Sequence, residues 1–289
     1  VSDANNVKFN GSFAASDKTI YLVGSGVGSD GNTSGILQKL NTDGSTYYSK
    51  SLSSTQPGTP NNYCELVSAC KNGTSVYVVG RTKPNASLNN AYNPDILVAK
   101  YTENSTGSAA NLTWQREFAG ISGITRSDIV TDIASVGDNI VIVGYTNTNT
   151  TSVYDGFLIY MNSSGDVITK RKITSASYGE KITSVRVDSN NNIFVVGTYS
   201  DTNILVSKLY LSGNRLLEDW SKSYSYTGYK FTDVSAVIDE YDQIYVTSCA
   251  ESISTGDRKV LHFMRLSNVG DIIKSQFNGV SNSSISITP

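Results

Sequence analysis

The sequence predicts an all-β fold, a five-bladed β-propeller of four-stranded antiparallel blades. One apolar run ending in glycine recurs along the whole chain, and each copy is followed by the same succession of turns and strands. Residues that favour strands and turns dominate, with 18 Tyr and 24 Gly against 2 Met. Apolar residues never keep a helical spacing over the roughly 12 residues that a stable helix needs. These observations exclude helical folds.

The repeated apolar run is the strongest signal in the sequence. Its five copies are Ile20–Gly24, Val76–Gly80, Ile140–Gly144, Ile193–Gly197 and Ile244–Ser248. Their spacing, about 50 to 65 residues, fits one propeller blade. Two stacked sheets could also be built from such strands, but a sandwich does not require the same four-strand pattern to be repeated. The repeat therefore favours the propeller.

The remaining strands of each blade follow in order. A strand with a small or apolar residue at a fixed position precedes each glycine-ending run and is expected at the centre. A second apolar run follows it, at Ile36–Leu40, Ile96–Tyr101, Phe157–Met161, Ile204–Leu209 and Val260–Leu266. A turn such as Asn41–Gly44 then leads into a more polar strand. That fourth strand contains Tyr48, Trp114, Thr169, Trp220 or Ile273 and suits a solvated outer edge.

The expected organisation is a single propeller domain over residues 1–289. Its approximate blades are 5–55, 61–120, 126–176, 180–227 and 230–280. Residues 281–289 either close the ring or lead into sequence that is absent here. The three cysteines are not expected to pair, since Cys64 and Cys70 lie too far apart on one extended strand and Cys249 belongs to another blade.

The repeat resembles the SBBP-type β-propeller repeat of bacteria and archaea. The resemblance is carried best by Asp95–Lys100, Trp114–Gly120 and Ile142–Thr146. It departs from that pattern at Tyr48, Thr169 and Ser248. The resemblance implies a propeller in an extracytoplasmic setting and carries over no catalytic residues.

Composition limits the partners. Only 17% of residues are charged and the formal net charge is −2, so the basic surface that nucleic acid requires is missing. No apolar run is long enough to insert into a membrane. A chain beginning at Val1 without a leader is expected to be a mature or trimmed product, extracellular or on a cell surface. Glycosylation candidates in predicted loops, turns and terminal segments are Asn32, Asn72, Asn85, Asn104, Asn111, Asn149, Asn162 and Asn282.

Four acidic residues are the candidates for chemistry. Glu65, Asp128, Glu180 and Asp233 lie where the inner strands of blades two to five begin. Two such carboxylates at the mouth of a propeller channel could flank a glycosidic bond, although solvated acids at loop ends are the alternative. His262 is the only histidine and is expected to be packed rather than catalytic. The column of Lys39, Lys100, Tyr160, Lys208 and Arg265 could hold an anion or pair with a neighbouring blade.

No metal site or cofactor is expected. Calcium is possible at the oxygen-rich segments Asp188–Asn192 and Asp239–Asp242. Both segments fall where the first hairpin of a blade must turn, so turn chemistry is the default explanation.

Three functions remain open. The leading hypothesis is a non-enzymatic, secreted or surface module that binds a glycan or a surface protein through loops. Those loops are Gly80–Pro94, Thr102–Asn111 and Gly144–Asp155, with Tyr92, Tyr145 and Tyr154 as weak binding candidates beside the four acids. One alternative is a self-assembling structural subunit of an extracellular layer, sheath or filament. The second alternative is a five-bladed-propeller glycoside hydrolase.

Overall fold

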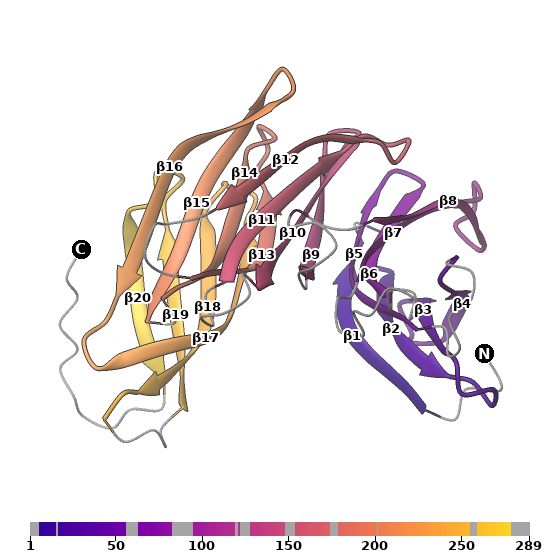
Figure 1. The fold of residues 1–289 in the computed structure, drawn as a ribbon, viewed down its shortest axis with the longest axis horizontal. Helices are drawn as coiled ribbons and strands as arrows, with labels where there is room; N and C mark the ends of the chain where they lie inside the picture. The colour runs from indigo at the N-terminus through magenta and orange to yellow at the C-terminus, as the bar shows by residue number, and fades with distance from the viewer. Residues whose placement is uncertain are drawn as a thin grey trace. The chain divides into compact units, whose positions relative to one another are not determined.

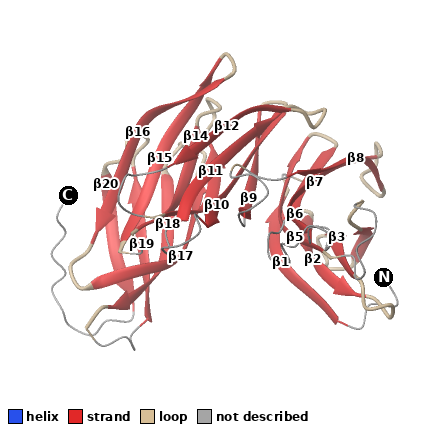
Figure 2. Ribbon diagram, in the orientation of Figure 1, coloured by secondary structure: helices blue, strands red, loops and turns tan. Residues whose placement is uncertain are grey.

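The computed structural model of the chain describes residues 6–15, 17–55, 63–82, 95–118, 121, 128–147, 154–173, 179–200, 202–254 and 259–278. Every regular element in these ranges is a β-strand, as Figure 2 shows. The strands form five separate four-stranded sheets. The predicted all-β fold of five four-stranded antiparallel blades is confirmed.

The twenty strands follow the repeat (Figure 1). They are β1 (Asn6–Ala14), β2 (Ile20–Val27), β3 (Thr33–Leu40) and β4 (Thr46–Leu52); β5 (Cys64–Asn72), β6 (Ser75–Thr82), β7 (Asp95–Glu103) and β8 (Ala110–Phe118); β9 (Asp128–Val136), β10 (Asn139–Asn147), β11 (Tyr154–Met161) and β12 (Val167–Ile173); β13 (Glu180–Val187), β14 (Ile193–Tyr199), β15 (Asn203–Ser212) and β16 (Arg215–Ser225); β17 (Tyr229–Ile238), β18 (Ile244–Ser252), β19 (Lys259–Leu266) and β20 (Ile272–Asn278). Within each sheet, strands adjacent in sequence are adjacent in space.

The chain groups into two compact units. The first contains Val1–Ile142 and Tyr160–Val167, and the second contains Val143–Ile159 and Ile168–Pro289. The first two sheets lie in the first unit and the last two in the second, while residues of the third sheet belong to both.

Each unit has its own apolar core, built from the second and third strands of its sheets. Val76, Val78 and Leu97 are fully buried in the first core. Val196, Val206 and Val246 are fully buried in the second. A sheet with neighbours on both faces needs apolar side chains on both sides of its middle strands, which explains the near-continuous apolar runs in the sequence.

The glycine that ends the repeated run is required by a close backbone approach. In the sheets that contain Gly24, Gly80 and Gly197, the inner strand carries a β-bulge opposite the glycine. A Cβ atom added to these glycines would lie 1.9, 2.1 and 2.0 Å from a carbonyl oxygen of that inner strand. Only glycine fits at this distance, which is the physical basis of the repeat.

The fifth sheet replaces this glycine with Ser248, and its bulge differs accordingly. Two residues of β17, Asp233 and Val234, lie opposite Ser248, and Asp233 takes a positive φ of 53°. β17 therefore pairs with the residues on both sides of Ser248 but has no residue paired directly with it, unlike the inner strands opposite Gly24, Gly80 and Gly197. Asp233, predicted as a site residue, is instead an exposed member of this bulge.

The cationic column pairs with neighbouring sheets. Lys100 Nζ and Trp114 Nε1 donate to the carbonyl oxygen of Ser163, at 3.3 and 3.0 Å. In the second unit, Lys208 donates to the side chain of Asn268, and Trp220 Nε1 donates to its carbonyl oxygen at 3.1 Å. Each lysine and tryptophan thus holds the outer hairpin of the next sheet, which favours the structural alternative for this column.

Two assignments made from the repeat need correction. Lys100 pairs with Trp114, whereas Arg265 pairs with Lys274, so Lys274 rather than Ile273 takes the tryptophan position. The connection expected over Thr102–Asn111 is shorter, because β7 continues to Glu103 and β8 begins at Ala110. The alternation of apolar and polar side chains could not place the end of β7 or the start of β8, because neither position carries a Gly or Pro that would mark the end of a strand.

Candidate active site

Within each unit, neighbouring inner strands run in the same direction, so their first residues lie at the same end of that unit. Between β5 and β9, Ser68 bonds to Asp132 and, four residues further along β5, Asn72 bonds to the Gly137 carbonyl. Contacts that advance together along both strands require a parallel arrangement. Glu65 and Asp128 therefore lie at the same end of the first unit, and both are buried.

The second unit repeats this arrangement. Thr183 on β13 donates to the Val234 carbonyl of β17 at 2.5 Å, and Ser189 bonds to Asp242 further along. Glu180, at the start of β13, is buried like Glu65 and Asp128. Three of the four predicted acids are therefore buried strand-end residues, which corrects the alternative that they are solvated.

Glu65 lies at the centre of a hydrogen-bonded cluster. Tyr63 Oη donates to its Oε2 at 2.6 Å, and Arg81 lies 3.2 Å from the same oxygen. Asn10 Nδ2, from the bulge of β1, donates to Oε1 at 3.0 Å, and Lys8 Nζ lies 4.0 Å from Oε1.

The cluster combines a phenol, a carboxylate and two cations. Burial raises the pKa of Tyr63 to about 12, and the hydrogen bond to Glu65 contributes to this rise. The phenol therefore keeps its proton at neutral pH and donates it to Glu65. Arg81 Nε is buried without a hydrogen-bond partner among the described residues, while the side chains of Arg81 and Lys8 are 32% and 76% exposed. The arrangement can attract an anion and transfer a proton from a hydroxyl to a carboxylate.

Tyr63 and Arg81 were not found by the sequence analysis. Both lie outside the repeated pattern, and Tyr63 stands in a segment that resembles a connection between blades. One signal was present: Tyr63 and Glu65 are two residues apart, so on an extended chain their side chains share a face.

The predicted binding tyrosines lie in strands or outside the described residues. Tyr145 is in β10 and Tyr154 begins β11, and their rings meet edge to face at 5.3 Å. Lys181 Nζ lies 4.4 Å from the Tyr154 ring centre. Tyr92 lies outside the described residues.

The predicted modification and calcium sites are used in local structure. Asp188 caps its own turn through the backbone amides of Asn190 and Asn192, and Asp239 does the same for Tyr241 and Gln243. No group of metal-ligating side chains was found in the described ranges.

Of the glycosylation candidates, Asn72 ends β5 and Asn111 is an exposed residue of β8, while Asn32, Asn104 and Asn162 form turns; Asn85, Asn149 and Asn282 lie outside the described residues. The three cysteines are free.

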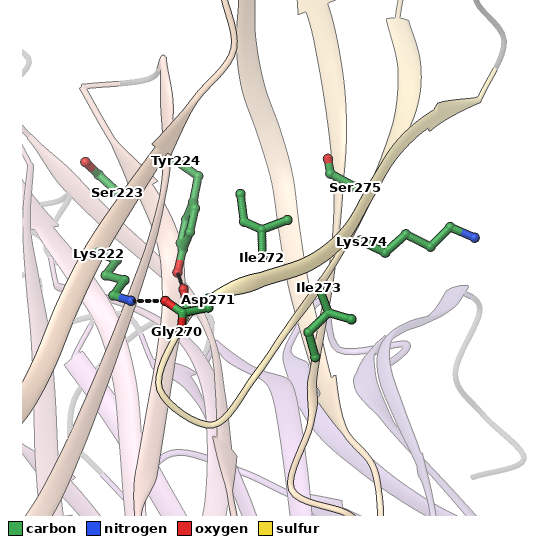
Figure 3. A pocket seen from close by; sticks show the side chains of 9 residues that line it. All are labelled: Lys222, Ser223, Tyr224, Gly270, Asp271, Ile272, Ile273, Lys274 and Ser275. Carbon is green, nitrogen blue, oxygen red and sulfur yellow. Dashed lines mark hydrogen bonds and ion pairs between the residues drawn. The ribbon is translucent and has the colours of Figure 1, made fainter. Parts of the chain in front are cut away.

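One pocket opens between the outer strands of the last two sheets. It has a volume of about 710 Å³ and is lined by Lys222, Ser223, Tyr224, Gly270, Asp271, Ile272, Ile273, Lys274 and Ser275. Figure 3 shows Lys222 reaching Asp271 and the Tyr224 hydroxyl reaching Gly270, at 2.9 and 2.6 Å. Ile272 and Ile273 also line the pocket, which therefore combines apolar surface with a charged pair.

His262 is fully buried and lies 3.0 Å from the hydroxyl of Ser275, which lines this pocket. Its ring contacts the rings of Tyr226, Phe231 and Phe277, at centre distances of 4.8, 5.4 and 4.6 Å. Burial lowers the pKa of His262 to about 4. The folded protein therefore holds this imidazole neutral through the mildly acidic range.

Stability is expected to fall on acidification because of His262. Its folded pKa lies below the unfolded value of about 6.5, so only the unfolded chain binds a proton between these values. The free energy of unfolding should drop by about 2 kcal/mol from pH 7 to pH 5. Urea titrations at both pH values check this, and His262→Gln should lose most of the drop. An equal drop in the variant would contradict the assignment.

No family model matches the chain, and no curated protein matches it. The SBBP-type resemblance is therefore not confirmed. Among solved structures, the chain is similar to Trypanosoma rangeli sialidase, with 13% identity, a TM-score of 0.54, and coverage of 94% of this chain and 49% of that one. It is also similar to the Pseudomonas aeruginosa periplasmic gluconolactonase PpgL (11%, TM-score 0.50, 96% and 72%) and to the polysaccharide lyase Uly1 (13%, TM-score 0.51, 91% and 58%).

These likenesses show a β-propeller fold, and the chain spans about half the length of the sialidase. They also correct the leading functional hypothesis. The sialidase, the gluconolactonase and the lyase are all enzymes, so the prediction of a non-enzymatic binding module was wrong and the enzyme alternative is favoured. In the described part of the chain, no helix could span a membrane.

Proposed function

We propose that this chain is a glycoside hydrolase that acts on an acidic sugar, with Tyr63 and Glu65 at its catalytic centre. The observation that carries the proposal is the 2.6 Å hydrogen bond from the Tyr63 phenol to the buried Glu65 carboxylate, beside Arg81. Tyrosine serves as the nucleophile in sialidases, which depart from the usual pair of carboxylates. The similarity of this chain to sialidase is a similarity of fold, so the role of Tyr63 is argued from its own contacts.

In the proposed reaction, Tyr63 Oη attacks the anomeric carbon while Glu65 accepts the phenolic proton. The bond from that carbon to the leaving oxygen breaks, and Asp128, at the start of the adjacent strand, supplies the proton that the leaving oxygen takes. Water then attacks the anomeric carbon and gives a proton back to Asp128, the bond from that carbon to Tyr63 Oη breaks, and Glu65 returns its proton to the phenol. Without the carboxylate the phenol would not lose its proton at neutral pH, because its pKa is raised to about 12.

Arg81 and Lys8 support an acidic substrate. Both side chains reach Glu65 and keep part of their surface exposed, so they can attract a carboxylate on the sugar. One structure of the sialidase contains 2,3-difluorosialic acid as a covalent intermediate, and this compound is an analogue of an acidic sugar substrate.

The test is turnover of 4-methylumbelliferyl glycosides, among them the sialic acid derivative. Tyr63→Phe and Glu65→Gln should each lower kcat/KM by about 100-fold or more, the usual size of a general-base contribution. Asp128→Asn should affect this activated leaving group less than a natural sugar leaving group. Tyr241→Phe and Glu240→Gln, on an exposed turn, are matched controls that should leave turnover unchanged.

Trapping with a 2,3-difluoro sugar acid, followed by peptide mass spectrometry, should place the adduct on Tyr63. An adduct on Glu65 would reassign the nucleophile and overturn the role given to Tyr63. Absence of both turnover and adduct, or full activity in the Tyr63 and Glu65 variants, would contradict the proposal.

A further inference from the structure

Three neighbouring strands of the fifth sheet carry a line of hydrogen-bonded side chains. Ser248 on β18 lies 3.1 Å from His262 Nδ1, and Ser275 on β20 lies 3.0 Å from His262 Nε2. Tyr226 Oη is 2.7 Å from Ser275 Oγ. When Ser275 donates to Nε2, the imidazole proton sits on Nδ1 and is donated to Ser248. The line thus runs in one direction from a hydroxyl, through a base, to an acceptor that orients the base.

The fold itself does not require this polar pair. At the same cross-strand position, the first, second and fourth sheets pair Gly24 with Ile36, Gly80 with Leu97, and Gly197 with Leu205. The fifth sheet alone among these pairs Ser248 with His262, both buried. Burial of an imidazole and a hydroxyl costs free energy that a glycine and a leucine would not. Departures from a structural pattern of this kind concentrate at functional sites.

Ser275 connects this line to the pocket. It is half-buried and lines the pocket of about 710 Å³, while His262, within hydrogen-bond distance of it, is fully buried. In Figure 3, Ile272 and Tyr224 lie side by side near Ser275, and Lys274 extends away from Lys222 and Tyr224. A group entering along Ile272 would therefore meet the Ser275 hydroxyl.

We propose that Ser275 is a nucleophile activated by His262, in a second catalytic site that hydrolyses carboxylic esters. Ser275 Oγ attacks the ester carbonyl carbon, and its proton passes to His262 Nε2. The bond from carbon to the alcohol oxygen breaks, and that oxygen takes the proton from His262. Water, deprotonated by His262, then attacks the acyl-serine and releases the acid and free Ser275. Ser248 holds the imidazole in the required orientation, as the third member of such a triad does.

The pocket suits an ester with a short apolar acyl group. Ile272, Ile273 and the Tyr224 ring provide apolar surface, and the volume lies within the range of sites for small molecules. The Lys222–Asp271 ion pair at the rim neutralises its own charge, at 2.9 Å, so the pocket does not demand a charged ligand. This site uses no residue of the Tyr63–Glu65 cluster.

The test is labelling of the whole chain with a fluorophosphonate, with peptide mapping, alongside hydrolysis of 4-nitrophenyl acetate and butyrate. The label should attach to Ser275. Ser275→Ala should abolish labelling, and His262→Gln should slow ester hydrolysis about 100-fold. Ser221→Ala is the matched control, because Ser221 holds the equivalent pairing position in the fourth sheet and bonds to Ser207 instead of a histidine.

A double variant separates loss of activity from loss of folding. Ser248→Gly with His262→Leu restores the pair found in the second sheet, so it should fold with an unchanged far-UV spectrum and yet lose the reactivity of Ser275. Labelling elsewhere, equal labelling of Ser275→Ala, or full ester hydrolysis by the double variant would overturn the proposal.

The pH profile provides an independent readout. Because burial lowers the pKa of His262 to about 4, ester hydrolysis should persist down to about pH 5 and fall as His262 is protonated near pH 4. Titratable groups around the line include Tyr226, Tyr224, Lys274 and the Lys222–Asp271 pair. A decline centred at pH 6 to 7 would contradict the assignment of His262 as the base.

Discussion

Replacing Glu103 with glutamine is expected to lower the free energy of unfolding by about 3 to 5 kcal/mol, the cost of removing one partner from a buried ion pair. Glu103 Oε1 accepts hydrogen bonds from Lys39, Tyr21 and Tyr48, at 3.0, 2.8 and 2.9 Å, and Lys71 lies 3.0 Å from Oε2. The side chains of Lys39 and Glu103 are only 2% and 3% exposed. The variant would leave a lysine buried without its counter-charge.

Chemical denaturation at pH 7 measures this loss. Asp219→Asn is the matched control, because the Asp219 side chain is 53% exposed and lies 3.6 Å from Lys208, so its removal should cost less than about 1 kcal/mol. A double variant, Glu103→Gln with Lys39→Met, should recover part of the loss. If Glu103→Gln costs no more than Asp219→Asn, the cluster does not stabilise the fold.

The same carboxylate should produce an acid-dependent loss of stability. Burial raises the pKa of Glu103, but the hydrogen bonds from Lys39, Lys71, Tyr21 and Tyr48 outweigh it and hold the pKa below the usual 4.5. A carboxylate with a lowered pKa in the folded state stabilises the fold at pH values above its unfolded-state pKa. This stabilisation disappears as the pH falls through the folded-state pKa. This window lies below about pH 4.5, under the range governed by His262.

The sequence predicted the fold because packing was written into a repeat. All five blades have the same apolar middle strands, and most of them share the glycine and the lysine and aromatic contacts, so the pattern recurs along the chain. The sites were predicted less well because they depend on departures from the repeat. Tyr63 lies before a strand, and Ser248 and His262 stand where the second sheet has a glycine and a leucine. The contact of His262 with Ser275 also depends on the register shift between β19 and β20, because a bulge changes which residues face each other.

The reason for the repeated glycine was also not evident from sequence, and it leads to the second large expected effect. Gly197→Ala should lower the free energy of unfolding by about 3 kcal/mol, at the upper end of the usual cost of overpacking. The new Cβ would lie 2.0 Å from the Lys181 carbonyl oxygen and 2.8 Å from the Ile182 Cα, so β13 would have to move away from β14. Elsewhere a Gly→Ala change often stabilises by restricting the unfolded chain, so the sign itself is informative.

The fifth sheet offers the matched comparison for this prediction. Ser248 occupies the same position, and it already carries a Cβ where β17 has no residue paired directly with it and Asp233 takes a positive φ. Ser248→Ala should therefore cost only about 1 kcal/mol, the hydrogen bond to His262. Urea denaturation of both variants against the unmodified chain measures the difference. Similar losses for Gly197→Ala and Ser248→Ala would mean that the bulge does not set the glycine requirement, because the steric argument predicts a cost only where the inner strand approaches most closely.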